Sequence, residues 1–229
     1  MRAINVMATA VVLARPDLTV RDAAKMLVDY HISGMPVVDT EGKLVGMITE
    51  GDLLHRTEIG TELKRRTRWL EFVASTRELA SEYVKEHSRL VGDVMTTNVV
   101  TATEDTPLAE IAELMERHGI KRVPVLKDGN VTGMVSRADL VRALASVGPD
   151  VRGSITPDDS AIRDAILAAL SGNRWALLPQ NVVVSKGIVH LWGAITSEEE
   201  RQAICVTARN VPGVKEVESH LEYPSIPLY

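Results

Sequence analysis

The stretch G-M-I-T-E-G-D-L at residues 46–53 decides the fold of this chain, because it returns as G-M-V-S-R-A-D-L at residues 133–140. Two other blocks return in the same order, and the spacing between the copies shortens by one residue in a turn near Gly129. A repeat unit usually cannot bury its apolar face alone. We therefore expect two copies that pack as a pseudo-symmetric module with equivalent clefts. The other blocks are I-S-G-M-P-V-V at 32–38, matched by I-K-R-V-P-V-L at 120–126, and V-M-A-T at 6–9, matched by V-M-T-T at 94–97.

Each copy has the pattern of a strand, a helix, two strands and a second helix, which predicts an α/β fold of the α+β type. Runs rich in β-branched residues at 11–12 and 99–100 predict the first strands. The next two strands flank turns at 41–42 and 128–129, where glycine between apolar runs favours a hairpin. The final helices are expected to start near Asp52 and Asp139. Apolar residues at helical spacing predict the first helices, with stripes of Val20, Ala23, Ala24 and Leu27 in one copy and Leu108, Ile111, Ala112 and Met115 in the other.

A third segment follows a linker rich in glycine, proline and aspartate. Its pattern predicts a helix over 161–170, strands over 181–184 and 188–192, and a second helix over 197–210. Ser197 is expected to cap that second helix, whose acidic first turn complements the helix dipole. A last strand begins near Val214, so the order of elements is αββαβ.

The duplicated motifs resemble a tandem pair of CBS domains, also called a Bateman module, and the third segment resembles a BON domain. The first resemblance rests on the V-M-x-T openings, the runs that contain Pro36 and Pro124, and the two closing blocks. The second rests on V-x-V-x-x-G-x-V-x-L-x-G at 182–193 and V-P-G-V at 211–214. The resemblances imply a homodimer through the CBS module and a BON domain that binds phospholipid or another macromolecule. The expected domains are CBS repeat 1 (1–56), a helical insert (57–88), CBS repeat 2 (89–146), a linker (147–158) and a BON-like domain (159–229).

The composition argues against several classes of protein. A net charge of −5 is unlike the basic face of a nucleic-acid binder, and one Phe, three Trp and four Tyr are few for a base-stacking platform. Cys205 is the single cysteine, so no internal disulfide demands an oxidising compartment. The apolar run near the N-terminus aligns with residues 94–102, so we interpret it as a strand of the first repeat rather than a signal peptide. No run approaches the ~20 apolar residues of a membrane span, and we expect a cytoplasmic protein.

The insert at 57–88 carries apolar residues among many charges and no proline, which is typical of an amphipathic helix. We interpret its apolar positions as a cover for the module or for its dimer mate. A docking surface for another protein is the alternative.

Thr49 with Asp52, and Ser136 with Asp139, are the clearest candidates for ligand binding. A hydroxyl three residues before a carboxylate, where a strand meets a helix, is also a motif that begins helices. A purely structural role is therefore the alternative. We favour binding because the pair occurs twice, in repeats that resemble CBS domains, where this motif contacts the ribose of adenosine ligands. The carboxylate would accept hydrogen bonds from the two ribose hydroxyls.

The two copies differ in charge. Lys121 and Arg122 stand where the first copy has Ser33-Gly34, and Arg137 stands where it has Glu50. Phosphate prefers cations that donate several hydrogen bonds, so we expect the second repeat to hold the phosphate and to bind more tightly. A solvated strand edge is the alternative for Lys121 and Arg122. The adenine is expected between aliphatic walls of Val12, Ile32 and Pro36 in the first copy and Val100, Ile120 and Pro124 in the second.

No motif predicts catalysis, and one Cys with six dispersed His predicts no metal site. Our leading hypothesis is a non-enzymatic regulatory sensor whose CBS module binds an adenine nucleotide and relays its occupancy to a partner. One alternative is a phospholipid- or envelope-associated adaptor that acts through the BON domain, with a structural CBS module. Another is a subunit that controls an enzyme or transporter from another gene. The ligand stays open among AMP, ADP, ATP, S-adenosylmethionine and NAD.

Overall fold

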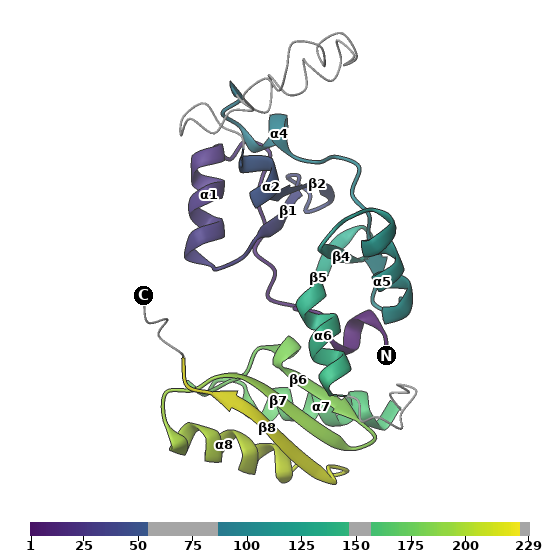
Figure 1. Ribbon diagram of the computed structural model, residues 1–229, viewed down its shortest axis with the longest axis vertical. Helices are drawn as coiled ribbons and strands as arrows, with labels where there is room; N and C mark the ends of the chain where they lie inside the picture. Colours follow the sequence, from purple (N-terminus) through teal and green to yellow (C-terminus); the bar gives the residue numbers. More distant parts are fainter. Residues whose placement is uncertain (55–86, 147–156, 225–229) are drawn as a thin grey trace, which may run out of the picture. The chain divides into compact units, whose positions relative to one another are not determined.

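The computed structural model describes residues 1–54, 87–146 and 157–224, and the chain forms two compact units (Figure 1). The first unit comprises Met1–Ala10, Thr101–Lys127 and Thr132–Tyr229, and the second comprises Val11–Val100 and Asp128–Val131. Nearly all of the predicted insert and most of the predicted linker lie outside the described residues. Within the described ranges, no helix combines the length and apolarity needed to cross a bilayer.

The second unit contains most of the first repeat. Its helix α1 (Val20–Asp29) is capped by Thr19, whose hydroxyl accepts a hydrogen bond from Asp22 N at 3.1 Å. The antiparallel strands β1 (Gly34–Val38) and β2 (Leu44–Thr49) follow, and α2 (Glu50–Leu53) continues directly from β2. The short helix α4 (Val91–Val94) returns to the same core. The buried core consists of Ala14, Val20, Ala23, Leu27, Met35, Val37, Ile48, Val91 and Val94.

The first unit contains most of the second repeat, and its elements occur in the same order. The sheet order is β3-β4-β5, with β3 parallel to β4. The hairpin turn between β4 and β5, whose residues Asp128–Val131 belong to the second unit, has positive φ at both Asp128 (52°) and Gly129 (79°), as the Asp-Gly motif predicts. The elements are η1 (Ala3–Asn5), β3 (Ala102–Thr103), α5 (Leu108–Arg117), β4 (Arg122–Lys127), β5 (Asn130–Ser136) and α6 (Arg137–Ala145).

Each leading V-M-x-T segment packs against the hairpin of the other repeat. In the first unit, Ala8 and Met134 exchange two backbone hydrogen bonds of 2.9 Å, and Met7 is buried in the core of the second repeat. In the second unit, Thr96 and Met47 exchange two bonds of the same length. The exchange is symmetric, and each leading segment completes the core of the repeat that it does not precede. The repeat pattern did not predict this exchange.

Two glycines make room for the leading methionines. A Cβ at Gly133 would lie 2.5 Å from Met7 Sδ, and a Cβ at Gly46 would lie 2.4 Å from Met95 Sδ. Each of these Cβ atoms would also lie 3.1 Å from a backbone carbonyl oxygen of the exchanged segment. The G-M motif of each repeat therefore has a packing role at these two positions.

We expect Gly133→Ala to lower the free energy of unfolding by roughly 1–3 kcal/mol, because overpacking forces Met7 and the backbone behind it to move. Gly46→Ala should have an effect of the same size. Urea denaturation measures both. Gly51→Ala is the matched control, because its nearest neighbour would lie 3.5 Å away, an ordinary contact. A Gly133→Ala protein as stable as the Gly51→Ala protein would contradict this account of the exchange.

The third segment forms an αββαβ domain within the first unit. Its sheet has the order β6-β7-β8, with β6 antiparallel and β8 parallel to β7. The helices α7 and α8 pack on one face of the sheet around a buried aliphatic core (Figure 1). The elements are α7 (Pro157–Leu170), η4 (Pro179–Asn181), β6 (Val182–Ser185), β7 (Ile188–Ala194), α8 (Glu198–Arg209) and β8 (Glu216–Glu222).

Several local predictions can be compared with the structure. Ser197 caps α8 as expected, and its hydroxyl accepts a hydrogen bond from Glu200 N at 3.2 Å. The helix α7 begins four residues before the predicted start at residue 161. The helix α5 forms over the predicted stripe, but only Ile111 and Met115 of that stripe are fully buried, and Ala112 is exposed. The first strands of the repeats also pair later than predicted, at Ala14 and at β3.

Candidate functional site

The first predicted pair lies where β2 ends and α2 begins. Asp52 Oδ2 accepts hydrogen bonds from Thr49 N at 3.0 Å and from Thr49 Oγ1 at 2.8 Å. Together the two residues form a capping box, which satisfies backbone donors at the helix start. The half-buried carboxylate is therefore held in a defined position at the strand–helix junction.

The second predicted pair has the same geometry with an additional cation. Asp139 Oδ2 accepts hydrogen bonds from Ser136 N at 2.8 Å and from Ser136 Oγ at 2.7 Å. Asp139 Oδ1 accepts a hydrogen bond from Arg142 Nη1 at 2.7 Å, and the Asp139 side chain is only 8% exposed. An ionised carboxylate offers about four acceptor positions. Roughly one therefore remains for a ligand, and a second becomes available if Arg142 moves.

Both pairs thus have the helix-capping role that the sequence allowed as the alternative to binding. Capping and ligand binding are compatible, because a cap fixes the direction in which the carboxylate points. The two pairs are not equivalent, because Asp139 is more deeply buried than Asp52. A ligand at Asp139 would meet a carboxylate that already balances the charge of Arg142.

The predicted phosphate-binding residues gather at the second junction. Arg137 N donates a hydrogen bond to Lys121 O at 3.0 Å, so these two residues lie side by side with exposed side chains. Arg122, next in the chain at the start of β4, is half-buried. The equivalent bond in the first repeat joins Glu50 N to Ser33 O at 3.2 Å. The same backbone geometry therefore presents cations in one repeat and an acidic and a neutral side chain in the other.

The residues predicted to flank the adenine are divided between the units. Pro36 is buried in the second unit, and Val12 and Ile32 pack at the edge of its core. In the first unit Pro124 is buried and Ile120 packs at the core edge, whereas Val100 belongs to the second unit. The structure therefore does not bring Val100 together with Ile120 and Pro124 within one unit.

A cavity of about 550 Å³ lies beside the first junction. Ile32, Ser33 and Glu50 line it together with residues of α1 and α2. Its volume is within the range of ~300–1,000 Å³ that is usual for small-molecule sites. Of the residues predicted for an adenine wall, Ile32 borders this cavity.

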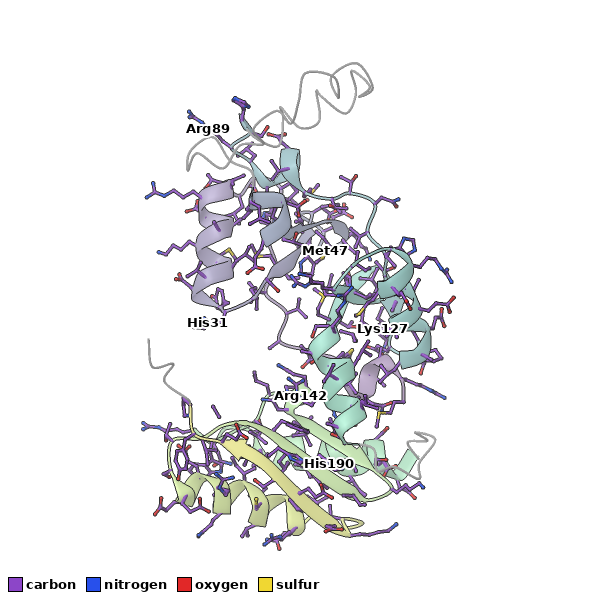
Figure 2. All side chains as sticks on the ribbon, in the orientation of Figure 1. His31, Met47, Arg89, Lys127, Arg142 and His190 are labelled. Carbon is purple, nitrogen blue, oxygen red and sulfur yellow. The ribbon has the colours of Figure 1, made fainter. Side chains whose placement is uncertain are left out.

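Helix α6 joins the second junction to the third domain within the first unit. Its N-cap is Ser136, and its C-cap Ser146 accepts a hydrogen bond from Trp192 Nε1 at 3.3 Å. Arg142, labelled in Figure 2, donates from Nη1 to Asp139 and also to Gln180 O at 3.3 Å. A change at Asp139 would therefore reach the contact between Arg142 and Gln180 of the third domain.

Arg163 of α7 is buried and donates hydrogen bonds to three backbone carbonyls. Its Nε reaches Val182 O at 3.0 Å, its Nη2 reaches Pro179 O at 2.8 Å, and its Nη1 reaches Ile4 O at 3.2 Å. Burial lowers the pKa of the Arg163 guanidinium, and the neighbouring Asp164 opposes that shift. This side chain therefore ties α7 to η4, β6 and the N-terminal segment.

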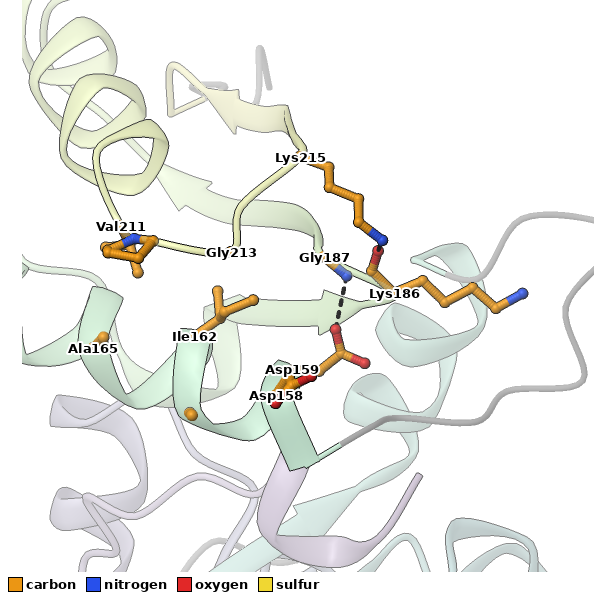
Figure 3. Close-up of a pocket in the computed structure, with 11 residues that line it drawn as sticks. Asp158, Asp159, Ile162, Ala165, Lys186, Gly187, Val211, Gly213 and Lys215 are labelled. Atoms are coloured by element: carbon orange, nitrogen blue, oxygen red, sulfur yellow. Dashed lines mark hydrogen bonds between the residues drawn. The ribbon is translucent and has the colours of Figure 1, made fainter.

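A second cavity, of about 810 Å³, lies on the third domain (Figure 3). Asp159 Oδ1 accepts a hydrogen bond from Gly187 N at 2.7 Å, and Lys215 Nζ donates to Lys186 O at 2.9 Å. Ile162 provides apolar surface between them. Because aspartate and lysine side chains both line this cavity, its charge does not select the anionic headgroup expected of a phospholipid.

The sequence pattern did not predict a cluster of His190, Glu218 and His220 on β7 and β8. Their nearest ligand atoms all lie within 4.8 Å of one another. Burial lowers the pKa of His190, Glu218 raises it, and His220 lowers it further. Alternation along β8 places Glu218 and His220 on one face and could have indicated two of the three residues. The contribution of His190 depends on the pairing of two strands that are distant in the sequence.

Comparisons with known families cover both halves of the chain. Residues 3–58 and 91–146 match the CBS domain family, and residues 158–225 match the BON domain family. The uncharacterized protein MJ1426 of Methanocaldococcus jannaschii is 34% identical over 133 residues, which are 54% of this chain and 79% of that protein.

Two further comparisons concern one plant protein. The chloroplastic CBS domain-containing protein CBSX2 of Arabidopsis thaliana is 30% identical over 147 residues, which are 62% of each chain. The chain therefore spans less than two thirds of the length of this relative. The crystal structure of CBSX2 in complex with AMP has a TM-score of 0.56 and 28% identity, and the match covers 64% of this chain and 97% of that chain.

Proposed function

This chain belongs to the CBS-domain family and carries a C-terminal BON domain, and we propose that it is a non-enzymatic regulatory protein whose CBS module binds an adenine nucleotide. The tighter site is the one in the second repeat, where Asp139 accepts hydrogen bonds from the ribose. Lys121, Arg122 and Arg137 hold the phosphate. The site in the first repeat, at Thr49 and Asp52, is weaker or takes a less charged ligand.

The observation that carries this proposal is the placement of cations and carboxylate at one strand–helix junction. Asp139 is fixed by Ser136, and the backbone bond from Arg137 to Lys121 brings two exposed cations to the same junction. A nucleotide requires both an acceptor for its ribose hydroxyls and donors for its phosphate. The crystal structure of CBSX2 in complex with AMP supports this class of ligand. In the aligned region, 28% of the residues of CBSX2 are identical to those of this chain.

The relay that we propose runs along α6. Ribose hydroxyls at Asp139 compete with Arg142 for the carboxylate, and Arg142 also holds Gln180 O of the third domain. Binding therefore changes the contact between α6 and the third domain. Such coupling is allosteric only if the affinity for nucleotide differs between two states of that contact.

A thermal-shift panel on the full chain tests the proposed ligand class. AMP, ADP, ATP, S-adenosylmethionine and NAD are compared with GMP and with free phosphate. A ligand at 100 times its Kd stabilises the native state by about 2.7 kcal/mol, so at least one adenosine ligand should raise the Tm clearly. If no adenosine ligand exceeds GMP and phosphate, the proposed function is wrong.

The adaptor hypothesis is separated from this one by liposome sedimentation. Trp192 of the third domain stacks on His220 at a centroid distance of 4.0 Å and donates to Ser146, whereas Trp175 is 37% exposed as a single side chain among exposed uncharged and basic residues. We therefore expect the full chain to stay in the supernatant with anionic vesicles, with or without AMP. Co-sedimentation without nucleotide would favour the adaptor.

We also propose that the chain forms a homodimer through its CBS module. Analytical ultracentrifugation measures the mass of the assembly and tests this directly.

A further inference from the structure

The third domain presents two imidazoles and a carboxylate on the sheet face opposite α7 and α8. In the parallel pair β7 and β8, His190 lies opposite Glu218, and Trp192 lies opposite His220. Side chains alternate between the two faces of a strand, so these four share a face. Val189 and Leu191 point instead into the aliphatic core with the helices. Figure 2 shows His190 on this sheet.

The distances between the three polar groups match the coordination sphere of one small cation. His190 Nδ1 lies 3.3 Å from His220 Nε2 and 3.4 Å from Glu218 Oε2, and His220 Nε2 lies 3.9 Å from Glu218 Oε2. In a tetrahedral zinc site, bonds of about 2.0–2.2 Å place neighbouring ligand atoms roughly 3.3–3.6 Å apart. Two of the three separations fall in that range, and the third exceeds it by a few tenths of an ångström.

The tautomers of the two imidazoles decide whether this cluster is held by hydrogen bonds or can bind an ion. A neutral imidazole carries one N–H and one lone pair, so His190 Nδ1 can donate either to His220 or to Glu218, but not fully to both. In the tautomers in which neither His190 Nδ1 nor His220 Nε2 carries a hydrogen, these two nitrogens and Glu218 Oε2 direct three lone pairs toward one point. A cation at that point accepts all three lone pairs at once.

The surroundings hold the cluster in place and leave one side open. The His190 side chain is only 7% exposed, whereas those of His220 and Glu218 are 32% and 45% exposed. The Trp192 ring stacks on His220 with an interplanar angle of 15°, and Trp192 Nε1 is itself anchored on Ser146. An ion here would thus have protein ligands on the inner side and water on the outer side.

We propose that His190, Glu218 and His220 bind one divalent transition-metal ion of the zinc class, with water completing its coordination. Two imidazole nitrogens and one carboxylate oxygen suit zinc and its neighbours in the first transition row better than magnesium or calcium, which prefer oxygen ligands alone. The site belongs to the third domain, and none of its three ligands is among the residues proposed to bind the nucleotide.

Zinc titration of the full chain tests this site. The protein is freed of metal with a chelator, carries no histidine tag, and is titrated without nucleotide by competition with a chromophoric chelator. We expect one zinc per chain. Glu218→Gln and His220→Gln should each weaken binding at least about tenfold, since even a lost supporting contact of a metal site weakens affinity by about 10–100-fold. Melting curves without metal establish that each variant is folded.

His118→Gln is the matched control, because His118 is exposed at the end of α5 and lies outside the cluster. It should bind zinc as the unaltered chain does. Substitution of cobalt for zinc adds a second readout, since the visible absorption of cobalt reports the coordination geometry. The site does not exist if the unaltered chain binds no zinc, or if Glu218→Gln and His220→Gln bind it as tightly as His118→Gln does.

Discussion

Asp139→Asn is expected to weaken AMP binding about 10- to 100-fold, as measured by isothermal titration calorimetry on the full chain. The substitution keeps the size of the side chain but removes its charge and replaces one acceptor oxygen with a donor. A hydrogen bond to a charged group contributes about 1.5–3 kcal/mol, and each 1.4 kcal/mol corresponds to about a tenfold change in affinity. The phosphate contacts remain, so binding weakens but is not abolished.

Asp52→Asn is the matched control, because it makes the same change in the capping box of the first repeat. We expect it to change the affinity of the tighter site by no more than about threefold. This change in binding free energy is well under the 1.4 kcal/mol that corresponds to a tenfold change in affinity. The melting temperature of both variants must be recorded, since each loses part of a helix cap. If Asp139→Asn binds AMP normally, or if Asp52→Asn loses as much affinity, the assignment of the tighter site is wrong.

Arg163→Leu is expected to lower the free energy of unfolding by about 3 kcal/mol or more. The substitution removes the donors of three backbone carbonyls at Val182, Pro179 and Ile4, and a lost hydrogen bond to a charged donor costs about 1.5–3 kcal/mol when its partner stays buried. Urea denaturation followed by tryptophan fluorescence measures the loss, because Trp192 lies in the same domain.

Two variants bracket this result. Arg209→Leu removes an exposed arginine from the last turn of α8 and should change stability by less than about 0.5 kcal/mol. Arg163→Lys keeps the charge but cannot donate in three directions through a planar fork, so it should fall between the two. An Arg163→Leu protein that unfolds at the same urea concentration as Arg209→Leu would show that these hydrogen bonds contribute little.

Local elements could be predicted well where a short motif determines the backbone. Asp128-Gly129 specifies a hairpin turn because both residues tolerate positive φ, and both adopt it. Ser197 specifies the start of α8 because its hydroxyl satisfies a free backbone donor of the first turn. The two hydroxyl–carboxylate pairs were located for the same reason, since a capping box spans only four residues.

The features that escaped prediction depend on contacts between distant segments. The exchange of the leading segments requires that Met7 fit over Gly133, and no local pattern encodes that pairing. The His190 cluster depends on the register of two parallel strands, which is set by packing on α7 and α8 rather than by either strand alone. Arg142 was also missed, although its bond to Asp139 is a local i,i+3 contact that the sequence could have indicated; only its bond to Gln180 joins distant segments.

We propose above all that the carboxylate of Asp139, in the second repeat, accepts hydrogen bonds from the ribose hydroxyls of an adenine nucleotide. A crystal of the full chain soaked in AMP tests it most directly. We predict electron density for the ribose with its hydroxyls at hydrogen-bonding distance, ~2.5–3.0 Å, from Asp139, and for the phosphate beside Lys121 and Arg137. An adenylate bound elsewhere, or no electron density for a nucleotide beside Asp139 at saturating AMP, would contradict the claim.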